Sequence, residues 1–294
     1  MKDRIALWRH AFSGDHNSID ATLTTFSWNL AVFQTVVKAV ELTAEDSDGN
    51  KPLNSMILEL LRSTYWSSAL LAIRRLTDRG SIDGKKGVIS LRSILNDVKL
   101  HRAKLTRRVF VEDIAGLAYD PHSHMNGGVP TAEEGGLISI PYRLSPDIIN
   151  MRHQTFDFLS GIDPSNRTPD DIISEKTFER LEARIAKLDD IADHATIHFA
   201  HAATDTSRQG RGIGPWGLQQ TQEALKILVE TAELIGRWFA YESLCAVLPV
   251  PQYDQFSHIN QPLFPIDDTS ALSAEWSKFS DMTETWINIE DIAL

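Results

Sequence analysis

The sequence predicts an all-α fold, a helical bundle with long loops and a proline-containing C-terminal extension. Along most of the 294 residues, apolar residues recur at spacings of three and four, which is the period of an amphipathic helix. Stretches rich in glycine and proline separate these periodic segments, and no internal repeat is evident. We therefore expect helices that wrap one core.

Three long helices are expected in the first half of the chain, over residues 18–45, 52–77 and 91–117. The first carries an apolar stripe of Leu23, Phe26, Leu30, Phe33, Val37 and Val40. A turn at residues 46–50 separates it from the second helix, and a loop at 80–87 follows that helix. Ser90 is the expected N-cap of the third helix.

The second half contains further expected helices over residues 146–159, 174–203, 218–247 and 271–287. Three polar, glycine- or proline-containing loops separate them, at 119–145, 163–171 and 210–217. The first of these has a short piece of extended character at 137–140. Its length is unusual in a compact domain, where such loops are functional or mobile.

These elements predict two parts. Residues 1–247 form the bundle, with the 119–145 loop as an insertion, and residues 248–294 form an extension with one short amphipathic helix. Trp276, Phe279 and Trp286 would line the apolar side of that helix. The extension either packs back on the bundle or docks a partner.

Composition narrows the class of protein. The hydrophobic content of 42% and charged content of 23% are those of a soluble globular protein, and the single cysteine, Cys245, fits a reducing compartment. The N-terminus lacks a signal peptide, and no run approaches the ~18 apolar residues of a membrane helix. We expect a cytoplasmic protein that makes no use of a membrane.

The net charge of −11 argues against a general affinity for nucleic acid. One segment is an exception, because its only acid is Asp97 while its basic residues are Lys85, Lys86, Arg92, Lys99, Arg102, Lys104, Arg107 and Arg108. Such a local basic face can meet a phosphate backbone, and it can equally be a solvated helix face.

Three histidines, His194, His198 and His201, lie within eight residues of one expected helix. On a helical wheel the core stripe consists of Phe178, Leu181, Ile185, Leu188, Ala192, Ala195 and Phe199. The three imidazoles share a face more than ~120° from the centre of this stripe. They are therefore expected outside the chain's own core, in a cleft or at an interface.

This face allows three interpretations. Two imidazoles four residues apart can hold one metal ion, with His122, His124 or Asp193 completing the site, although no HExxH pattern is present. Alternatively, the histidines are polar interface residues without chemistry. In the third interpretation they are acid–base groups for RNA cleavage, which needs no metal but needs a nearby cation. The candidate cations are Arg74, Arg75, Arg208 and Arg211.

Three segments resemble one known family. Residues 69–78, which end in RLTD, precede a polar loop and the SLRSIL segment of residues 90–95, and HFAH follows at 198–201. In this order they resemble the HEPN superfamily, and more narrowly its AbiU-like branch, which is linked to bacterial abortive infection. The resemblance covers roughly residues 19–239. It implies an all-α homodimer with metal-independent endoribonuclease activity, in phage defence or a toxin–antitoxin system.

Active members of that superfamily carry an arginine and, after four to six intervening residues, a histidine. If His201 is the motif histidine, the arginine belongs at positions 194–196, which here are His194, Ala195 and Thr196. A protonated His194 could replace it, helped by Asp193 or Asp190, and so could an arginine from elsewhere, such as Arg75 or Arg208.

The sequence thus predicts a HEPN-like endoribonuclease or RNA-binding homodimer, with no cofactor and no metal. His201 is the expected acid–base residue, with His194 and His198 as auxiliaries. The expected RNA or phosphate contacts are Arg75, Arg102, Arg107 and Arg208. Asp78 is expected to be structural, through an ion pair with Arg75 and contacts to the following loop. The expected partners are a second copy, RNA, and an antitoxin or regulatory protein. The alternatives are a non-catalytic binding or regulatory module of the same fold and a metal-dependent hydrolase.

Overall fold

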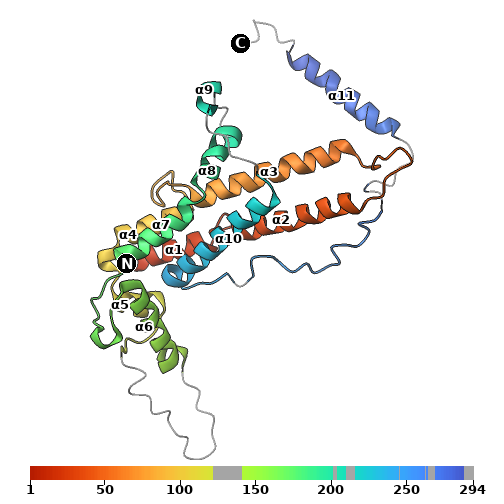
Figure 1. Cartoon of the computed structure of the whole chain (residues 1–294). Coiled ribbons are helices and arrows are strands. Elements are labelled where there is room, and N and C mark those ends of the chain that lie inside the picture. Colours follow the sequence, from red (N-terminus) through yellow and green to blue (C-terminus); the bar gives the residue numbers. More distant parts are fainter. Residues whose placement is uncertain are drawn as a thin grey trace, which may run out of the picture. The chain divides into compact units, whose positions relative to one another are not determined.

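The computed structural model describes residues 1–121, 141–200, 204–209, 216–244, 246–261, 263 and 269–287. Within these residues all regular secondary structure is helical, apart from an isolated antiparallel bridge between Thr106 and Ile172. The predicted all-α helical bundle is therefore confirmed (Figure 1). Among the described helices, none combines the length with the apolar character that a bilayer crossing requires.

The chain divides into two compact units, Met1–Pro249 and Val250–Leu294. The first contains the bundle and every predicted site residue. The second contains one helix, α11 (Ser270–Ile287), close to the predicted bounds of 271–287. Each unit has its own internal contacts.

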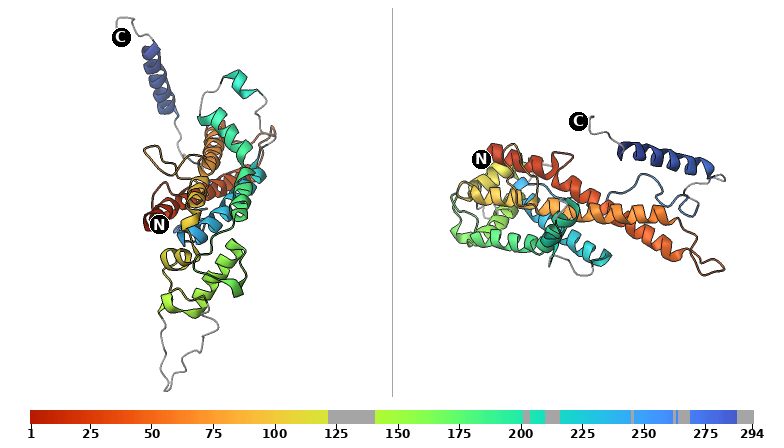
Figure 2. Two further views of the ribbon diagram at one scale, coloured as in Figure 1. Left: turned by 90° about the vertical axis from the view of Figure 1, so that its left-hand side faces the viewer. Right: turned by 90° about the horizontal axis from the view of Figure 1, so that it is seen from above.

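Two long helices, α2 (Ile19–Leu42) and α3 (Ser55–Thr77), run side by side in the first unit (Figures 1 and 2). Each begins at a polar cap. The Ser18 hydroxyl accepts the backbone N–H of Ala21 at 3.3 Å, and the Asn54 side chain accepts that of Ile57 at 3.0 Å. Both helices were predicted, because their periodic apolar residues and their capping residues lie within or next to the helix in the sequence.

The apolar stripe of α2 is buried only along its first half. Leu23 and Phe26 are buried, whereas Phe33 and Val37 are only partly covered. Phe33 lies against Tyr65 of α3, with stacked rings whose centroids are 3.9 Å apart. The far halves of α2 and α3 therefore pack on each other and extend past the main core.

Helix α1 (Lys2–Ser13) was not predicted from the sequence. It packs against α2 and against the π-helical segment at residues 236–240, and it buries four side chains: Ile5, Trp8, Ala11 and Phe12. The contact with Gly236 is close, because a Cβ there would lie 2.3 Å from the Phe12 ring. Charged residues lie between the apolar ones, so the composition of this segment does not indicate a buried helix. The apolar residues themselves recur at spacings of three and four, which is the signal that could have predicted it.

The single helix predicted over residues 91–117 is wrong. The chain forms α4 (Leu91–Leu100), then three short turns, η1 (Arg102–Lys104), α5 (Arg107–Val109) and the π-helix η2 (Phe110–Ile114). The backbone N–H of Arg107 donates to the carbonyl of Asp171 at 2.9 Å, which is far away in sequence. This tertiary bond turns the chain where the local periodicity predicted a continuous helix.

The second half of the bundle contains α6 (Pro146–Ser160), α7 (Glu175–Ala186), α8 (Asp189–Ala195), α9 (Asp205–Arg208) and α10 (Leu218–Ile235). Shorter turns accompany them: η3 (Tyr142–Leu144), η4 (Pro164–Asn166) and the π-helices η5 (Thr196–Ala200) and η6 (Gly236–Ala240). Helix α10 packs against α2, α3 and α7, and so closes the core. It ends earlier than the predicted Val247, because Tyr241 adopts a left-handed conformation with φ of +58°.

Candidate functional site

The histidine segment lies where α8 passes into the π-helix η5. The rings of His194 and His198 are neighbours, with centroids 4.1 Å apart and planes inclined by 30°. His198 is exposed and His194 is partly buried. Imidazole is suited to acid–base work near neutral pH, and π-helical turns recur at functional sites. This pair is therefore the centre of the candidate site.

The continuous helix predicted over residues 174–203 is wrong. Helix α7 ends at Ala186, and α8 begins anew at Asp189 after Leu188, whose φ of −103° and ψ of 2° are not helical. The break shifts the helical phase. Ile191 and Ile197 are buried, and Phe199, predicted on the core stripe, is 40% exposed.

Arg74 of α3 contacts the histidine segment through Thr196, which is two residues away from both His194 and His198. Its Nε donates to Thr196 Oγ1 at 2.9 Å, and that hydroxyl donates to the carbonyl of Ala192 at 2.9 Å. Thr196 stands at one of the three positions where the HEPN pattern places an arginine. A guanidinium from a neighbouring helix is thus hydrogen-bonded to a position where the pattern expects an arginine and this sequence has none.

Arg92 anchors the start of α8. This buried side chain donates to Asp189 Oδ1 at 2.7 Å and to Glu182 Oε1 at 2.8 Å, and Arg79 reaches Asp189 Oδ2 at 2.7 Å. Two arginines therefore fix the acidic N-terminus of α8, where negative charge is favourable. The position of the histidine pair follows from this anchor together with the Arg74 contact.

The last residues of the RLTD segment are hydrogen-bonded to the first residues of the SLRSIL segment. The Ser90 hydroxyl donates to the carbonyl of Asp78 at 2.7 Å, and Arg92 Nη1 donates to the carbonyl of Thr77 at 3.0 Å. Asp78 Oδ1 accepts the backbone N–H of Gly80 at 2.7 Å, which is a contact to the following loop. The expected ion pair between Asp78 and Arg75 is absent from the described part of the chain.

Arg75 donates instead to the carbonyl of Asn17 at 2.6 Å. It lines a cavity of about 290 Å³ together with His16, Ala21, Thr22, Thr25, Phe26, Ser68, Leu71 and Ala72. Neither His194 nor His198 lines this cavity. Arg75 faces the cavity, whereas Arg74 is hydrogen-bonded to Thr196 of the histidine segment.

The predicted phosphate contact at Arg107 is wrong. Its side chain is fully buried, and its guanidinium lies 2.8 Å from both Asp157 Oδ1 and Asp171 Oδ2. Arg167 binds the same Asp157 carboxylate. Arg107 is therefore committed to an interior ion-pair network and offers no donor to a phosphate at the surface.

The other two predicted phosphate contacts also have acidic neighbours. Arg102 donates from Nε to the carbonyl of Ile173, and its Nη1 lies 3.9 Å from Glu175 Oε2. Arg208 is exposed on α9 and pairs with Asp205. Lys99 also binds Glu175, at 2.6 Å. Much of the predicted basic face is thus neutralised within the chain, while Lys85, Lys86 and Lys104 stay exposed.

Several candidates fall outside the described residues: His122, His124, His201 and Arg211. Among the described residues, no group of three or more His, Cys, Asp or Glu side chains could hold a metal ion.

Two buried polar residues of α6, Arg152 and His153, were missed from the sequence. Both lie on the helix face that carries the buried Ile149, Phe156 and Leu159. An arginine and a histidine among the apolar positions of one helix face could have been noticed in the sequence. Such residues are candidates for a specific role, because buried polar groups need specific partners.

No family model, no curated protein and no solved structure matches this chain. The HEPN resemblance therefore stays a prediction from the sequence motifs.

Proposed function

We propose that this chain is a HEPN-like protein that binds RNA and cleaves it without a metal ion. The observation that carries the proposal is the adjacent imidazole pair, His194 and His198, with Arg74 on the neighbouring Thr196. Acid–base groups beside a cation are the elements that metal-free RNA cleavage requires. A role in phage defence or a toxin–antitoxin system comes with the resemblance and belongs to the same proposal.

The reaction uses the RNA's own 2′-hydroxyl. One imidazole takes the hydroxyl proton while that oxygen bonds to the adjacent phosphorus. The bond from phosphorus to the 5′-oxygen breaks, and a protonated imidazole gives this oxygen a proton. The products are a 2′,3′-cyclic phosphate and a free 5′-hydroxyl. His201 keeps its expected acid–base role, and its auxiliaries His194 and His198 supply the second imidazole that the reaction needs.

Arg74 takes the part of the missing motif arginine. A guanidinium has five N–H donors in a planar fork that fits phosphate oxygens, and one donor of Arg74 is used for Thr196. The remaining donors would offset the negative charge that builds on the phosphate in the transition state. This assignment replaces Arg75, Arg102 and Arg107, whose contacts lead elsewhere.

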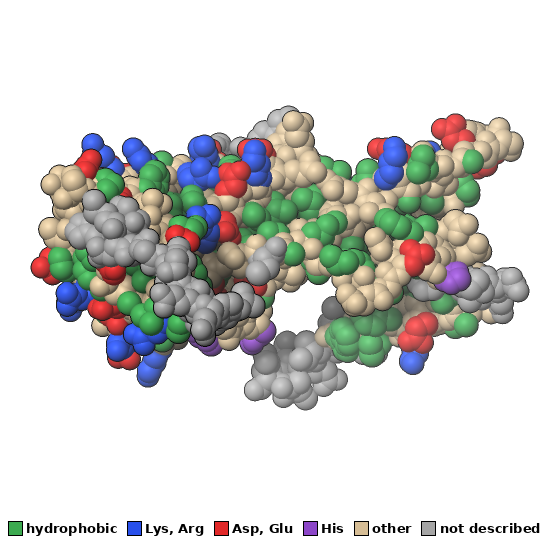
Figure 3. All heavy atoms as spheres, turned by 90° about the horizontal axis from the view of Figure 1, so that it is seen from below, with side chains coloured by type: hydrophobic (Ala, Val, Ile, Leu, Met, Phe, Trp, Pro, Cys, Tyr) green, Lys and Arg blue, Asp and Glu red, His purple; other side chains and the backbone are tan. Residues whose placement is uncertain are grey.

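A second copy of the chain is the proposed partner of the α2–α3 apolar surface. This surface consists of exposed side chains on the two long helices: Val32, Leu42, Met56, Leu60, Leu61 and Leu71. Hydrophobic side chains are visible at the molecular surface over this region in Figure 3. Exposed apolar side chains gathered on two neighbouring helices support an interface, and homo-oligomers most often close by two-fold symmetry.

RNA cleavage in a metal chelator tests the proposed reaction. The purified full-length protein should cleave RNA in the chelator and leave 2′,3′-cyclic phosphate ends. His198→Ala should lower the rate by about 10²–10⁴-fold, the range for an acid–base group. The exposed His16 provides a matched control, since His16→Ala should leave the rate unchanged. Cleavage that depends on an added metal, or that survives in His198→Ala, would overturn the proposed chemistry.

The non-catalytic module is the second candidate, and the aromatic face of α11 favours it. Trp276, Phe279 and Trp286 are 72%, 57% and 59% exposed. Exposed aromatic clusters act as anchors for protein partners. In this alternative, an antitoxin or regulatory protein binds α11. Replacement of Trp276 and Phe279 by serine would then abolish partner binding, and the wild-type protein would cleave no RNA.

A further inference from the structure

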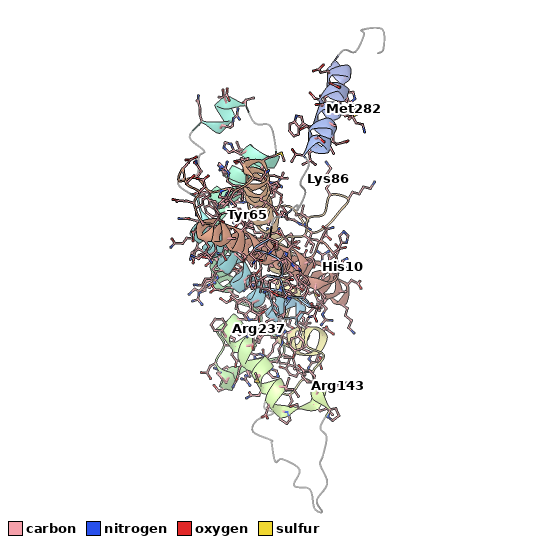
Figure 4. All side chains as sticks on the ribbon, turned by 90° about the vertical axis from the view of Figure 1, so that its right-hand side faces the viewer. His10, Tyr65, Lys86, Arg143, Arg237 and Met282 are labelled. Carbon is pink, nitrogen blue, oxygen red and sulfur yellow. The ribbon has the colours of Figure 1, made fainter. Side chains whose placement is uncertain are left out.

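A pocket of about 410 Å³ lies between α6 and the end of η6, within the unit Met1–Pro249. Its lining residues are Tyr142, Ile148, Met151, Arg152, Thr155, Arg237, Trp238, Tyr241, Glu242 and Ser243. Figure 4 labels Arg237 where the continuation of α10 meets α6. The pocket contains none of the residues of the histidine site, and its volume falls in the ordinary range for small-molecule sites.

Arg152 is a buried cation in the wall of this pocket. Its side chain is only 5% exposed, and it donates to the carbonyls of Phe110, Arg237 and Trp238 at 3.3, 3.0 and 3.0 Å. No carboxylate of the described residues lies within ion-pair distance of it. A buried charge without a counterion is costly, and burial accordingly lowers the pKa of Arg152 to about 9. The site is electrostatically incomplete without an anion.

Aromatic rings hold the Arg152 guanidinium in place. Its central carbon lies 3.4 Å from the centroid of the Phe110 ring and 4.7 Å from that of Tyr241. The Tyr241 hydroxyl in turn shares a hydrogen bond of 2.5 Å with the Tyr142 hydroxyl. The plane of the guanidinium is therefore fixed before any ligand arrives. Three of its five N–H donors serve backbone carbonyls, which leaves two.

The other lining residues determine which further chemical groups a ligand of this pocket could carry. Arg237 adds a second cation at the rim, and its Nε lies 3.9 Å from Glu233 Oε1. Glu242, the acid in the lining, accepts a hydrogen bond from the Ser13 hydroxyl. The apolar lining comes from Ile148, Met151 and Trp238. The lining thus holds two cations, one acid that already accepts a hydrogen bond, and apolar side chains that suit a planar ring.

We propose that this pocket binds a small organic anion that carries a planar ring and one carboxylate or phosphate group. The anionic group would sit on the free donors of Arg152 and on Arg237. The ring would lie against Trp238 and the tyrosines. This site is independent of the proposed RNA cleavage, because no residue is shared.

Calorimetric titration of the full-length protein tests this proposal with three probes: indole-3-acetate, uridine 5′-monophosphate and inorganic phosphate. At least one ring-bearing anion should bind saturably and more tightly than phosphate alone. The first two probes distinguish a carboxylate from a phosphate ligand. Arg237→Gln should weaken that binding about tenfold, which corresponds to ~1.4 kcal/mol.

The chain offers a matched control for Arg237, which is 55% exposed and 3.9 Å from an acid one turn away. Arg108 is 58% exposed and 4.0 Å from Glu112, also one turn away, so Arg108→Gln should bind like the wild type. Thr155→Trp fills the pocket from a partly exposed position and should abolish binding. The proposal is overturned by a lack of binding to both ring-bearing probes, by unchanged binding in Thr155→Trp, or by equal losses in Arg237→Gln and Arg108→Gln.

Discussion

His153 is fully buried beside two interior arginines. Neither of its ring nitrogens has a hydrogen-bond partner among the described residues, and its ring meets that of Tyr119 edge-on at 5.3 Å. Burial, and after it the positive charges of Arg107 and Arg167, lowers the pKa of His153 from 6.5 to about 4. The imidazole is therefore neutral in the folded protein at neutral pH.

This lowered pKa predicts a pH-dependent stability. Between pH 6.5 and 4 the unfolded chain binds a proton at His153 that the folded chain does not, so acidification favours unfolding. The free energy of unfolding should fall by about 2–3 kcal/mol across this window through this residue alone. Urea denaturation of His153→Phe should show a shallower loss than the wild type. His16→Phe, at an exposed position, is the control, and a slope in His153→Phe equal to that of the wild type would refute the assignment.

The arginines show how much of a site the sequence can predict. The sequence identified Arg74 as one of four candidate cations, because any arginine near the histidines would serve. The sequence could not tell which of Arg74 and Arg75 contacts the histidine segment, because this depends on the tertiary neighbours of each side chain. Arg74 donates to Thr196, and Arg75 donates to the carbonyl of Asn17. Arg107 was misassigned for the same reason, because its two aspartates come from distant segments.

At the scale of elements, helices α2 and α3 were predictable and the segments after α4 and α7 were not. The first pair has long apolar periods and side-chain caps in the adjoining sequence. By contrast, α4 and α7 are followed by breaks that tertiary contacts impose, at Arg107 by the carbonyl of Asp171 and at Asp189 by Arg92 and Arg79. A local pattern carries no information about such contacts, so it predicted continuous helices in both places.

Ser90 fixes the start of α4 and its junction with the end of α3. Its hydroxyl accepts the backbone N–H of Ser93 at 2.8 Å and donates to the carbonyl of Asp78 at 2.7 Å. Ser90→Ala removes both bonds from a fully buried position and should lower the free energy of unfolding by about 1–2 kcal/mol. Urea denaturation measures this loss. Ser81→Ala, in the exposed loop between the two helices, should cost less than Ser90→Ala, and an equal cost would contradict the cap.

At the scale of the whole molecule, the proposed homodimer depends on the α2–α3 apolar surface. Met56, Leu60 and Leu71 share one face of α3 by helical phase, and they are 62%, 64% and 37% exposed. On α2 the exposed apolar side chains are Val32 and Leu42, which lie outside the stripe that packs in the bundle and on α3. This arrangement could not be read from the sequence, because a periodic stripe does not reveal where its own chain stops covering it.

A charge on this surface should disrupt the dimer. Leu60→Glu places a carboxylate among apolar side chains and should shift the sedimentation velocity of the protein from dimer to monomer. Leu100→Glu is the matched control, because Leu100 is 78% exposed at the end of α4 and should leave the dimer intact. A wild-type protein that sediments as a monomer, or a dimer that survives Leu60→Glu, would contradict the proposed interface.

We propose that Arg74 and the histidine pair act together on RNA. The decisive measurement is single-turnover RNA cleavage in chelator by the wild type and by Arg74→Gln. We expect Arg74→Gln to lower the cleavage rate by about 10²–10³-fold, the range for removal of one transition-state donor. Arg62→Gln, an exposed change on the same helix, should cleave like the wild type. Equal rates in Arg74→Gln and the wild type, or no cleavage by the folded wild-type protein, would contradict the claim.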